Sequence, residues 1–236
     1  MRVLNFDLST TCIGAVAVDI SDASGKISLM KSCPIVPGKF HPTGLGFEKT
    51  KKKVRASRNS KETISSWVRK GEEIVSASEK RRRDVAVREA QNLFLLTDLG
   101  ASMGKLVDGV APHIINVEQN AMFNGILTIE LLAKLLGVLL GVAATRCIPV
   151  NQFKVVTVRA RWDPAKLVRE FSKRHSAEQL KAFPDVTKAA LRAAAAEKYG
   201  QFGLCLRTDD ESDACIVFDY WYEEIYLPGR KAQTKL

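Results

Sequence analysis

The sequence has few of the residues that build zinc sites or disulfide frameworks. Its 236 residues include three isolated histidines and five scattered cysteines, none of which form a CxxC pair. The cysteines are Cys12, Cys33, Cys147, Cys205 and Cys215. Structural zinc sites need closely spaced cysteine and histidine pairs, and disulfide-rich secreted domains use an even set of cysteines. We therefore expect reduced cysteines and no zinc site.

Long apolar runs are also scarce. The longest extends from Ile126 to Ala144, and Glu130 and Lys134 interrupt it at helical spacing. A membrane-spanning helix needs about 20 predominantly apolar residues, so a buried helix is the better interpretation. The stretch from Arg2 to Asp7 lacks the long apolar core of a signal peptide. These features predict a cytoplasmic protein that makes no membrane contact.

Carboxylates, in contrast, occupy places where such groups are easily gathered. Asp7 ends the apolar run Val3–Phe6, and a second apolar run, Ile13–Val18, follows, so the chain start is predicted to be a hairpin. Glu118 ends another strand of the buried type, His113–Val117. A carboxylate at the end of a central strand can face solvent while the strand stays in the core. Both acids are therefore candidates for a functional site.

A second pair of acids opens the last strongly apolar helix. Asp210 and Asp213 are one helical turn apart and share a face, with Thr208 or Asp209 as the expected N-cap. Glu211 is expected to point away from that face. An acidic first turn is also ordinary helix capping, so the pair gains significance only in combination with the two strand-end acids.

Gathering Asp7, Glu118, Asp210 and Asp213 is costly unless cations neutralise them, because like charges repel strongly in a low-dielectric cleft. Oxygen-only ligands select hard cations such as Mg²⁺ or Mn²⁺. We predict two ions, bridged by Asp7, that activate a water and stabilise the leaving 3′ oxygen during in-line phosphodiester cleavage. The four acids are thus both the candidate metal ligands and the candidate catalytic residues.

The charge balance indicates a nucleic-acid partner. The formal net charge is +10 and the sequence pI is about 9.4. Seven basic residues and no acidic one lie between Lys49 and Lys61. The candidate DNA-binding residues in this run are Lys51, Lys52, Lys53, Arg55 and Arg58. Many charge runs are only solvated surface, but beside a metal site a basic arm can hold the DNA backbone.

The same run belongs to a predicted insertion. Residues 40 to about 75 are expected to form a basic insertion that is mobile when no nucleic acid is bound. It precedes a helix predicted from apolar spacing between Ser76 and Leu106. Including the insertion, residues 1–236 are predicted to form a single domain.

The acidic motifs resemble those of the RuvC-type Holliday-junction resolvases, members of the RNase H-like nuclease superfamily. The three matching segments occur in the family's order: Asn5 to Gly14 around the first Asp, Val117-Glu118-Gln119, and Asp210 to Ala214. The resemblance implies an α/β fold with an RNase H-like mixed sheet flanked by helices. It also implies a homodimer that makes two symmetric nicks in branched DNA, most readily a four-way junction. The insertion before the Glu118 strand is longer than usual and suggests a phage or viral source.

The resemblance also points to residues that contact DNA. Members of the family place lysines near the junction backbone, and Lys154 and Lys188 fall nearest to those places, with Lys166 as a rival. Lys188 is the candidate for a catalytic role. Bacterial members carry an aromatic residue three positions after the Glu, where this chain has Ala121; Phe123 is the candidate to replace it, with Met122 as the alternative.

The role of two glycines in the apolar helix remains open at this level. Gly137 and Gly141, four residues apart in the apolar helix, suit either close packing on the sheet or contact with a second copy in a dimer.

Other functions also remain open. A nuclease of this kind could act on a flap or a fork instead of a four-way junction. The Asp7–Gly14 segment also resembles the first phosphate loop of actin-like ATPases and sugar kinases. That superfamily needs a second phosphate loop and an adenosine motif, neither of which we find. A binding module without catalysis is disfavoured, because an unused acidic cluster would be costly to keep.

Overall fold

The computed structural model describes the chain except for residues 10, 41–46, 58–59, 70–76, 120–125 and 234–236. Within the regular elements, the side chains of residues 47–57, 60–69, 77–83, 119, 126–127 and 233 also lie outside the description. The chain forms two compact units, one made of residues 1–36 and 99–236 and the other of residues 37–98.

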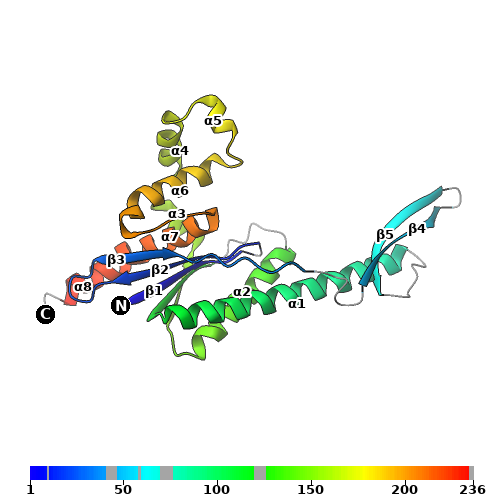
Figure 1. Ribbon diagram of the computed structural model, residues 1–236, viewed down its shortest axis with the longest axis horizontal. Coiled ribbons are helices and arrows are strands. Elements are labelled where there is room, and N and C mark those ends of the chain that lie inside the picture. Colours follow the sequence, from blue (N-terminus) through cyan, green and yellow to red (C-terminus); the bar gives the residue numbers. More distant parts are fainter. Residues whose placement is uncertain (10, 41–46, 58–59, 70–76, 120–125, 234–236) are drawn as a thin grey trace. The chain divides into compact units, whose positions relative to one another are not determined.

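A five-stranded mixed sheet forms the centre of the larger unit, in the order β3-β2-β1-β6-β7 (Figure 1). Its strands are β1 (Arg2–Asp7), β2 (Gly14–Ile20), β3 (Ile27–Ser32), β6 (Ile114–Gln119) and β7 (Val150–Lys154). The first three strands pair antiparallel, whereas β6 pairs parallel with both β1 and β7. The predicted hairpin at the chain start and the predicted mixed sheet flanked by helices are confirmed.

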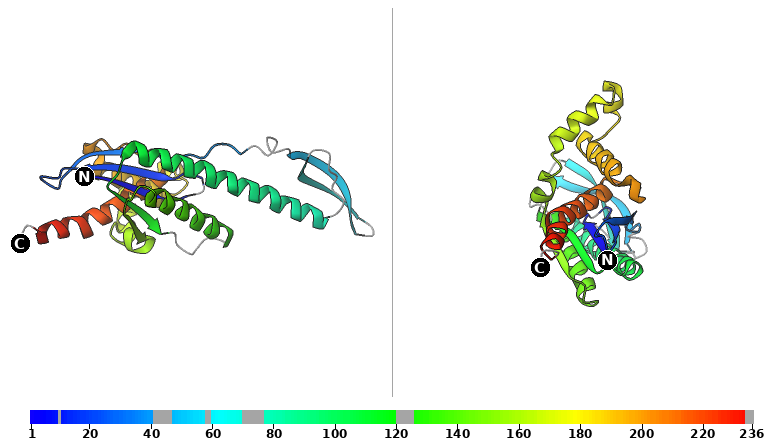
Figure 2. Two further views of the ribbon diagram at one scale, coloured as in Figure 1. Left: turned by 90° about the horizontal axis from the view of Figure 1, so that it is seen from below. Right: turned by 90° about the vertical axis from the view of Figure 1, so that its left-hand side faces the viewer.

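Helices cover both faces of this sheet (Figures 1 and 2). α7 (Asp209–Trp221) packs on one face, where Ala214 and Phe218 lie in one apolar cluster with Val3 and Val16. The part of α1 (Ala77–Val110) from Leu99 onward and α2 (Ile126–Ala144) lie on the other face. Their buried side chains include Leu99, Met103, Val107, Leu135 and Leu139. The two apolar helices predicted from the sequence therefore form, and both contribute to the core.

Four helices connect β7 to α7. They are α3 (Val155–Ala160), α4 (Pro164–Lys173), α5 (Ala177–Lys181) and α6 (Val186–Tyr199), and the short 3₁₀ helix η2 (Gly200–Phe202) follows them. Side-chain caps from Asp163, Ser176 and Asp185 start α4, α5 and α6. After α7, the chain continues through a π-helical turn, η3 (Tyr222–Tyr226), into α8 (Leu227–Gln233). In the described part of the chain, no helix is both long and apolar enough to cross a membrane.

A ladder of asparagine side chains crosses the centre of the sheet. Asn116 Nδ2 donates to Asn5 Oδ1 at 2.9 Å, and Asn151 Nδ2 donates to Asn116 Oδ1 at 2.9 Å. Asn5 Nδ2 in turn donates to the carbonyl of Val16. Asn5 and Asn116 are fully buried, so these bonds satisfy groups that water cannot reach. The ladder links neighbouring residues of β1, β6 and β7 and so favours the register that places Asp7 beside Glu118.

Replacing Asn116 with Ala is expected to destabilise the protein by roughly 2–4 kcal/mol. The substitution leaves the buried Asn5 Oδ1 without its donor and the partly buried Asn151 Nδ2 without its acceptor, and an unpaired buried group costs about 1–3 kcal/mol. Asn151→Ala breaks only one of the two bonds and serves as the graded control, with a smaller loss. Urea unfolding of both variants measures the difference. A loss for Asn116→Ala no greater than that for Asn151→Ala would refute the structural role of the ladder.

The smaller unit contains an antiparallel pair, β4 (Phe47–Ser57) and β5 (Ser60–Arg69). The unit also contains the first part of α1, up to Asp98. Gly38 N donates to Asp98 Oδ2 at 2.7 Å, and the rings of Phe40 and Phe94 lie 5.7 Å apart. The predicted basic insertion thus contains two strands that the sequence did not indicate. The side chains of the candidate DNA-binding residues Lys51, Lys52, Lys53 and Arg55, and Arg58 as a whole, lie outside the described residues.

Candidate active site

The structure brings the four predicted acids to one end of the sheet. Asp7 is the last residue of β1, and because Phe6 pairs with Val117 in the adjacent parallel strand, Asp7 and Glu118 occupy neighbouring positions. α7 begins beside them with Asp210 and Asp213. The charges of Asp213, Glu118 and Asp210 all raise the pKa of Asp7, which reflects the closeness of the four groups.

Gly14 allows α7 to approach the sheet at this point. It pairs with Asp7 in the first hairpin, and a Cβ atom at Gly14 would lie only 1.9 Å from the carbonyl oxygen of Asp210. The neighbouring atoms belong to the backbone of Asp210 and Glu211, so a side chain at this position requires the helix to move. The distance between the strand carrying Asp7 and the helix carrying Asp210 thus depends on a glycine.

Gly14→Ala is therefore expected to displace the start of α7, to destabilise the fold by about 1–3 kcal/mol and to lower activity. Gly109→Ala, in the last turn of α1, is a suitable control, because a Cβ there would meet nothing within 4 Å among the described residues. Thermal unfolding and cleavage assays on both variants test this expectation. Wild-type stability in Gly14→Ala would show that the close approach is not required.

The first turn of α7 carries two more acids, Asp209 and Glu211, which lie outside the cluster and have other partners. Thr208 is the N-cap, and together with Glu211 it forms a capping box. Glu211 is fully buried and accepts hydrogen bonds from Ser32 and from the backbone N–H of Arg207. Asp209 lies 3.4 Å from Arg192 in an ion pair. Glu211 therefore has a structural role, in agreement with its expected direction away from the cluster.

Burial and mutual repulsion make the four acids hard to ionise. Burial raises the pKa of Glu118 to about 7, despite the opposing effect of Arg159. Burial also raises the pKa of Asp7 well above its usual range, with further increases from the three neighbouring acids. The pKa values of Asp210 and Asp213 are likewise raised, chiefly by burial. Such a cluster is electrostatically unfavourable when ionised, which is the property expected of a site for positively charged ligands.

Arg159 is a member of this site that sequence reasoning missed. It lies in the last turn of α3, where its Nη2 donates to Asp213 Oδ2 at 3.1 Å and stands 3.9 Å from Glu118 Oε1. Its charge lowers the pKa values of Asp7, Glu118 and Asp213. No local motif marks the residue, because its position depends on how α3 packs against α7.

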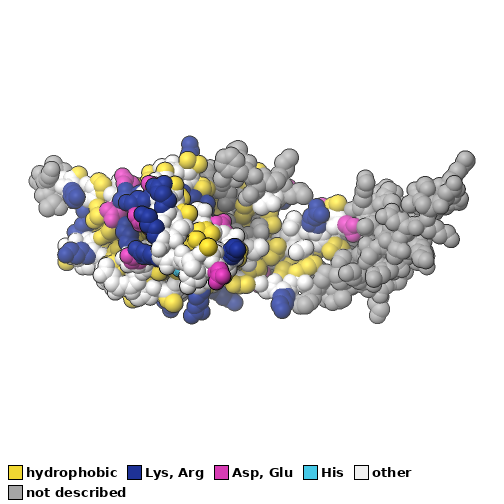
Figure 3. All heavy atoms as spheres, turned by 90° about the horizontal axis from the view of Figure 1, so that it is seen from above, with side chains coloured by type: hydrophobic (Ala, Val, Ile, Leu, Met, Phe, Trp, Pro, Cys, Tyr) yellow, Lys and Arg dark blue, Asp and Glu magenta, His cyan; other side chains and the backbone are white. Residues whose placement is uncertain are grey.

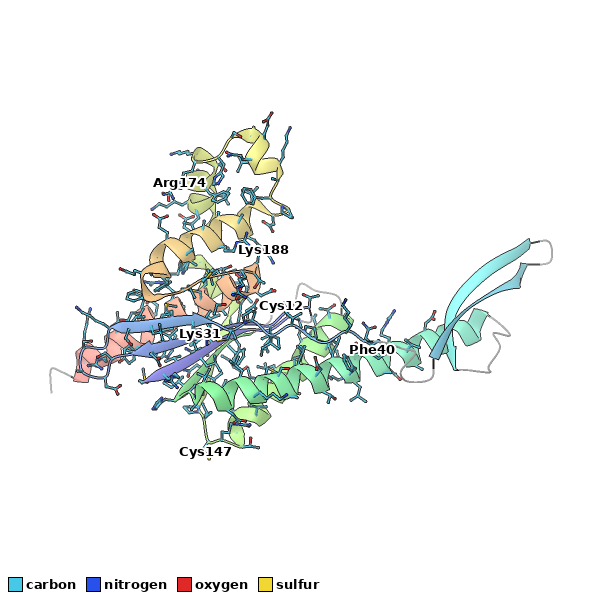
Figure 4. The ribbon with its side chains drawn as sticks, in the orientation of Figure 1. Cys12, Lys31, Phe40, Cys147, Arg174 and Lys188 are labelled. Carbon is cyan, nitrogen blue, oxygen red and sulfur yellow. The ribbon has the colours of Figure 1, made fainter. Side chains whose placement is uncertain are left out.

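Of the three candidate lysines, the structure places Lys188 nearest to the acids. Its charge lowers the pKa values of both Asp210 and Asp213. Figure 4 shows Lys188 at the start of α6, near the end of the sheet where Cys12 is labelled. Lys154, at the end of β7, and Lys166, on α4, are exposed. Neither of them is among the main causes of the pKa shifts of the four acids. Phe123 lies outside the described residues.

The donor set fits a hard divalent cation. All four candidate ligands supply carboxylate oxygens, which Mg²⁺ and Mn²⁺ prefer. Glu118 is 3% exposed, and its buried Oε2 atom has no hydrogen-bond partner among the described residues. A buried carboxylate oxygen without a partner is costly unless a ligand binds it. In the described part of the chain, no three His, Cys, Asp or Glu side chains are placed to hold one ion as they stand.

Comparisons with known proteins gave matches to solved structures only. No protein-family model matches the chain, and no significant match was found among curated proteins. Two structures of Thermus thermophilus RuvC, one in complex with a Holliday junction substrate, are similar to it, each with 13% identity and a TM-score of 0.43. Each alignment covers 92% of this chain and 90% of the RuvC chain.

The yeast mitochondrial Holliday junction resolvase Ydc2 is also similar, with 11% identity and a TM-score of 0.40. That alignment covers 93% of this chain and 78% of the Ydc2 chain. At such low identity no function is transferred from these proteins, and the function proposed below depends on the chain's own side chains.

Proposed function

We propose that the protein is a divalent-metal-dependent, structure-selective DNA endonuclease that resolves four-way junctions. The observation that carries this proposal is the gathering of Asp7, Glu118, Asp210 and Asp213 at one end of the sheet, with raised pKa values and two cationic side chains nearby. A buried acidic cluster of this kind suits Mg²⁺ or Mn²⁺ and the cleavage of phosphodiesters.

The proposed chemistry divides between the acids and the neighbouring cations. The four carboxylates would hold the metal ions, and the chemistry that these ions would supply is activation of a water and neutralisation of charge on the leaving 3′ oxygen. Glu118 and Asp213, 3% and 4% exposed, are held by β6 and α7 and so present their oxygens in fixed positions. Lys188 supplies positive charge beside Asp210 and Asp213, where it can attract a phosphate of the scissile strand.

Basic side chains near the site support DNA as the substrate. From Val155 to Tyr199, the segment that forms α3 to α6, the sequence has ten Lys or Arg and five Asp or Glu residues. Figure 3, which views the larger unit from the side of these helices, shows Lys and Arg side chains gathered there with a few acids among them. Lys154 is exposed at the end of β7, immediately before this segment. Positive charge on this surface would hold phosphates near the acids.

A homodimer is proposed as well, because paired nicks need two active sites. Gly137 and Gly141 are exposed on α2, and a Cβ atom at either position would meet nothing within 4 Å among the described residues. Among the described residues nothing packs against either glycine, which supports this face of α2 as the contact with a second copy. Light scattering of the purified protein distinguishes one copy from two.

The proposed function is tested with labelled DNA substrates of equal length: a four-way junction, a flap, a fork and a plain duplex. The intact protein and Asp7→Asn are compared in Mg²⁺. Preferential cutting of the junction, lost in the variant while DNA binding persists, is the expected result. Equal or faster cutting of the flap or the fork would retain the metal site but assign the protein to general branched-DNA processing. No cutting of any substrate would refute the nuclease proposal.

A further inference from the structure

Arg159 is placed at the acid cluster by the packing of α3. Val158, the preceding residue, is fully buried in an apolar cluster with Leu191, Ile216 and Val217. This contact fixes α3 against α7 and α6, so that the next side chain reaches toward Asp213. The Arg159 side chain is 40% exposed, whereas the side chains of its two acidic partners are 5% and 3% exposed. The guanidinium thus closes the cluster from its solvent side.

The guanidinium occupies oxygens that a metal ion would need. Nη2 of Arg159 lies 3.1 Å from Asp213 Oδ2 and 3.9 Å from Glu118 Oε1, so one nitrogen bridges two candidate ligands. An arginine has only donors and no lone pair for a cation, and it stays charged at any pH at which the protein is folded. Arginine and a divalent cation are therefore competitors for the same pair of carboxylates.

The bridge is incomplete on both sides. The buried atoms Glu118 Oε2 and Arg159 Nε both lack a hydrogen-bond partner among the described residues. A well-formed structural ion pair satisfies such groups, because unpaired buried polar atoms are costly. Glu118 Oε2 is an acceptor that a bound cation would satisfy, and Arg159 Nε is a donor that a bound anion would satisfy.

We propose that Arg159 is a counter-ion that holds Glu118 and Asp213 together until a divalent cation enters, and that it is then displaced to bind a DNA phosphate. This inference rests on the proposed function, because it assumes that the acids bind metal. Displacement needs only rotation of a long, partly exposed side chain. The guanidinium then presents its planar set of donors to a phosphate close to the acids.

The inference predicts opposite effects on stability and on metal affinity. Arg159→Gln removes the counter-ion, so the metal-free variant is expected to unfold at a lower temperature than the wild type. The same variant is expected to bind Mn²⁺ about tenfold more tightly, because no cation has to be displaced. Saturating Mg²⁺ should reduce or remove the difference in unfolding temperature.

Arg161→Gln is the matched control. Arg161 extends from the C-terminal end of the same helix but pairs with Asp219, at 3.3 Å, and with Glu224, away from the four acids. The control loses the same charge from the same segment, so any general effect on folding or net charge appears in both variants. Mn²⁺ affinity of Arg161→Gln is expected to match that of the wild type.

Calorimetric titration with Mn²⁺ measures affinity for the wild type and both variants. In the wild type, the Nε–H resonance of Arg159, assigned by its absence in Arg159→Gln, is expected to shift when Mg²⁺ is added, and to shift again with a short duplex. This second measurement stays informative if Arg159→Gln does not fold without metal.

The outcomes separate the two proposals. Tighter Mn²⁺ binding by Arg159→Gln alone, with a moving Arg159 resonance, supports the counter-ion role. Equal or weaker Mn²⁺ binding by Arg159→Gln, or a resonance that Mg²⁺ leaves unchanged, overturns that role and leaves the metal site intact. A wild-type protein and variants that all fail to bind Mn²⁺ overturn the metal dependence and, with it, this inference.

Discussion

Asp7→Asn is expected to reduce junction cleavage by at least about 10³-fold, or about 4 kcal/mol of transition-state stabilisation. The substitution keeps the size of the side chain but removes a charge from the centre of the acid cluster. Because Asp7 is repelled by three other acids, its loss is not expected to destabilise the fold. DNA binding, which depends on basic side chains elsewhere, should be retained.

Asp209→Asn is the control for this prediction. It makes the same chemical change in the first turn of α7, at a residue that pairs with Arg192 instead of joining the cluster. Its cleavage rate is expected to stay within a few-fold of the wild-type rate. Single-turnover assays on the junction, together with gel-shift measurements of binding, give both quantities. Comparable activity in Asp7→Asn and the wild type would exclude Asp7 as a metal ligand.

The second large effect concerns the stability of the metal-free protein as a function of pH. The folded-state pKa of Glu118 is raised from 4.5 to about 7, so the folded protein binds this proton more tightly than the unfolded chain does. Stability from this source is fully present below pH 4.5 and is lost as pH rises through about 7. For Glu118 the change corresponds to about 3 kcal/mol. The raised pKa values of Asp7, Asp210 and Asp213 act in the same direction.

Urea unfolding in a chelator at pH 5 and pH 8 measures this effect, with Glu118→Gln as the comparison because it removes one titrating group. The wild type is expected to lose more stability than the variant between the two pH values. Added Mg²⁺ should restore most of the loss at pH 8, since bound cations favour the ionised acids. An identical pH dependence in the wild type and the variant, unaffected by Mg²⁺, would contradict the electrostatic description of the cluster.

The features predicted correctly from the sequence are those with local signals. Asp7 and Glu118 follow apolar strand patterns, and a strand pattern specifies where its end lies. Asp210 and Asp213 lie one turn apart in a helix that begins with a capping residue, which fixes their common face. These patterns were sufficient to predict the hairpin, the strand that carries Glu118 and the helix that carries Asp210 and Asp213, whereas the mixed sheet was predicted from the family resemblance.

The features that were missed depend on contacts between distant segments. Arg159 reaches the acids because Val158 is buried against α6 and α7, which no pattern in α3 reveals. The asparagine ladder requires the pairing of three strands that lie far apart in the sequence. Gly14 could be recognised as important only once the backbone of Asp210 was seen to lie against it. The position of Arg159, the asparagine ladder and the close approach at Gly14 all depend on tertiary packing, which sequence periodicity does not encode.

The most direct test of the central claim is to map the nicks that the wild-type protein makes in a four-way junction, with each strand labelled in turn, in Mg²⁺ and in a chelator. Nicks at symmetric positions on two opposed strands are expected in Mg²⁺, and none are expected in the chelator. Intact strands in Mg²⁺, or the same nicks in the chelator, would contradict a metal-dependent nuclease site built from Asp7, Glu118, Asp210 and Asp213.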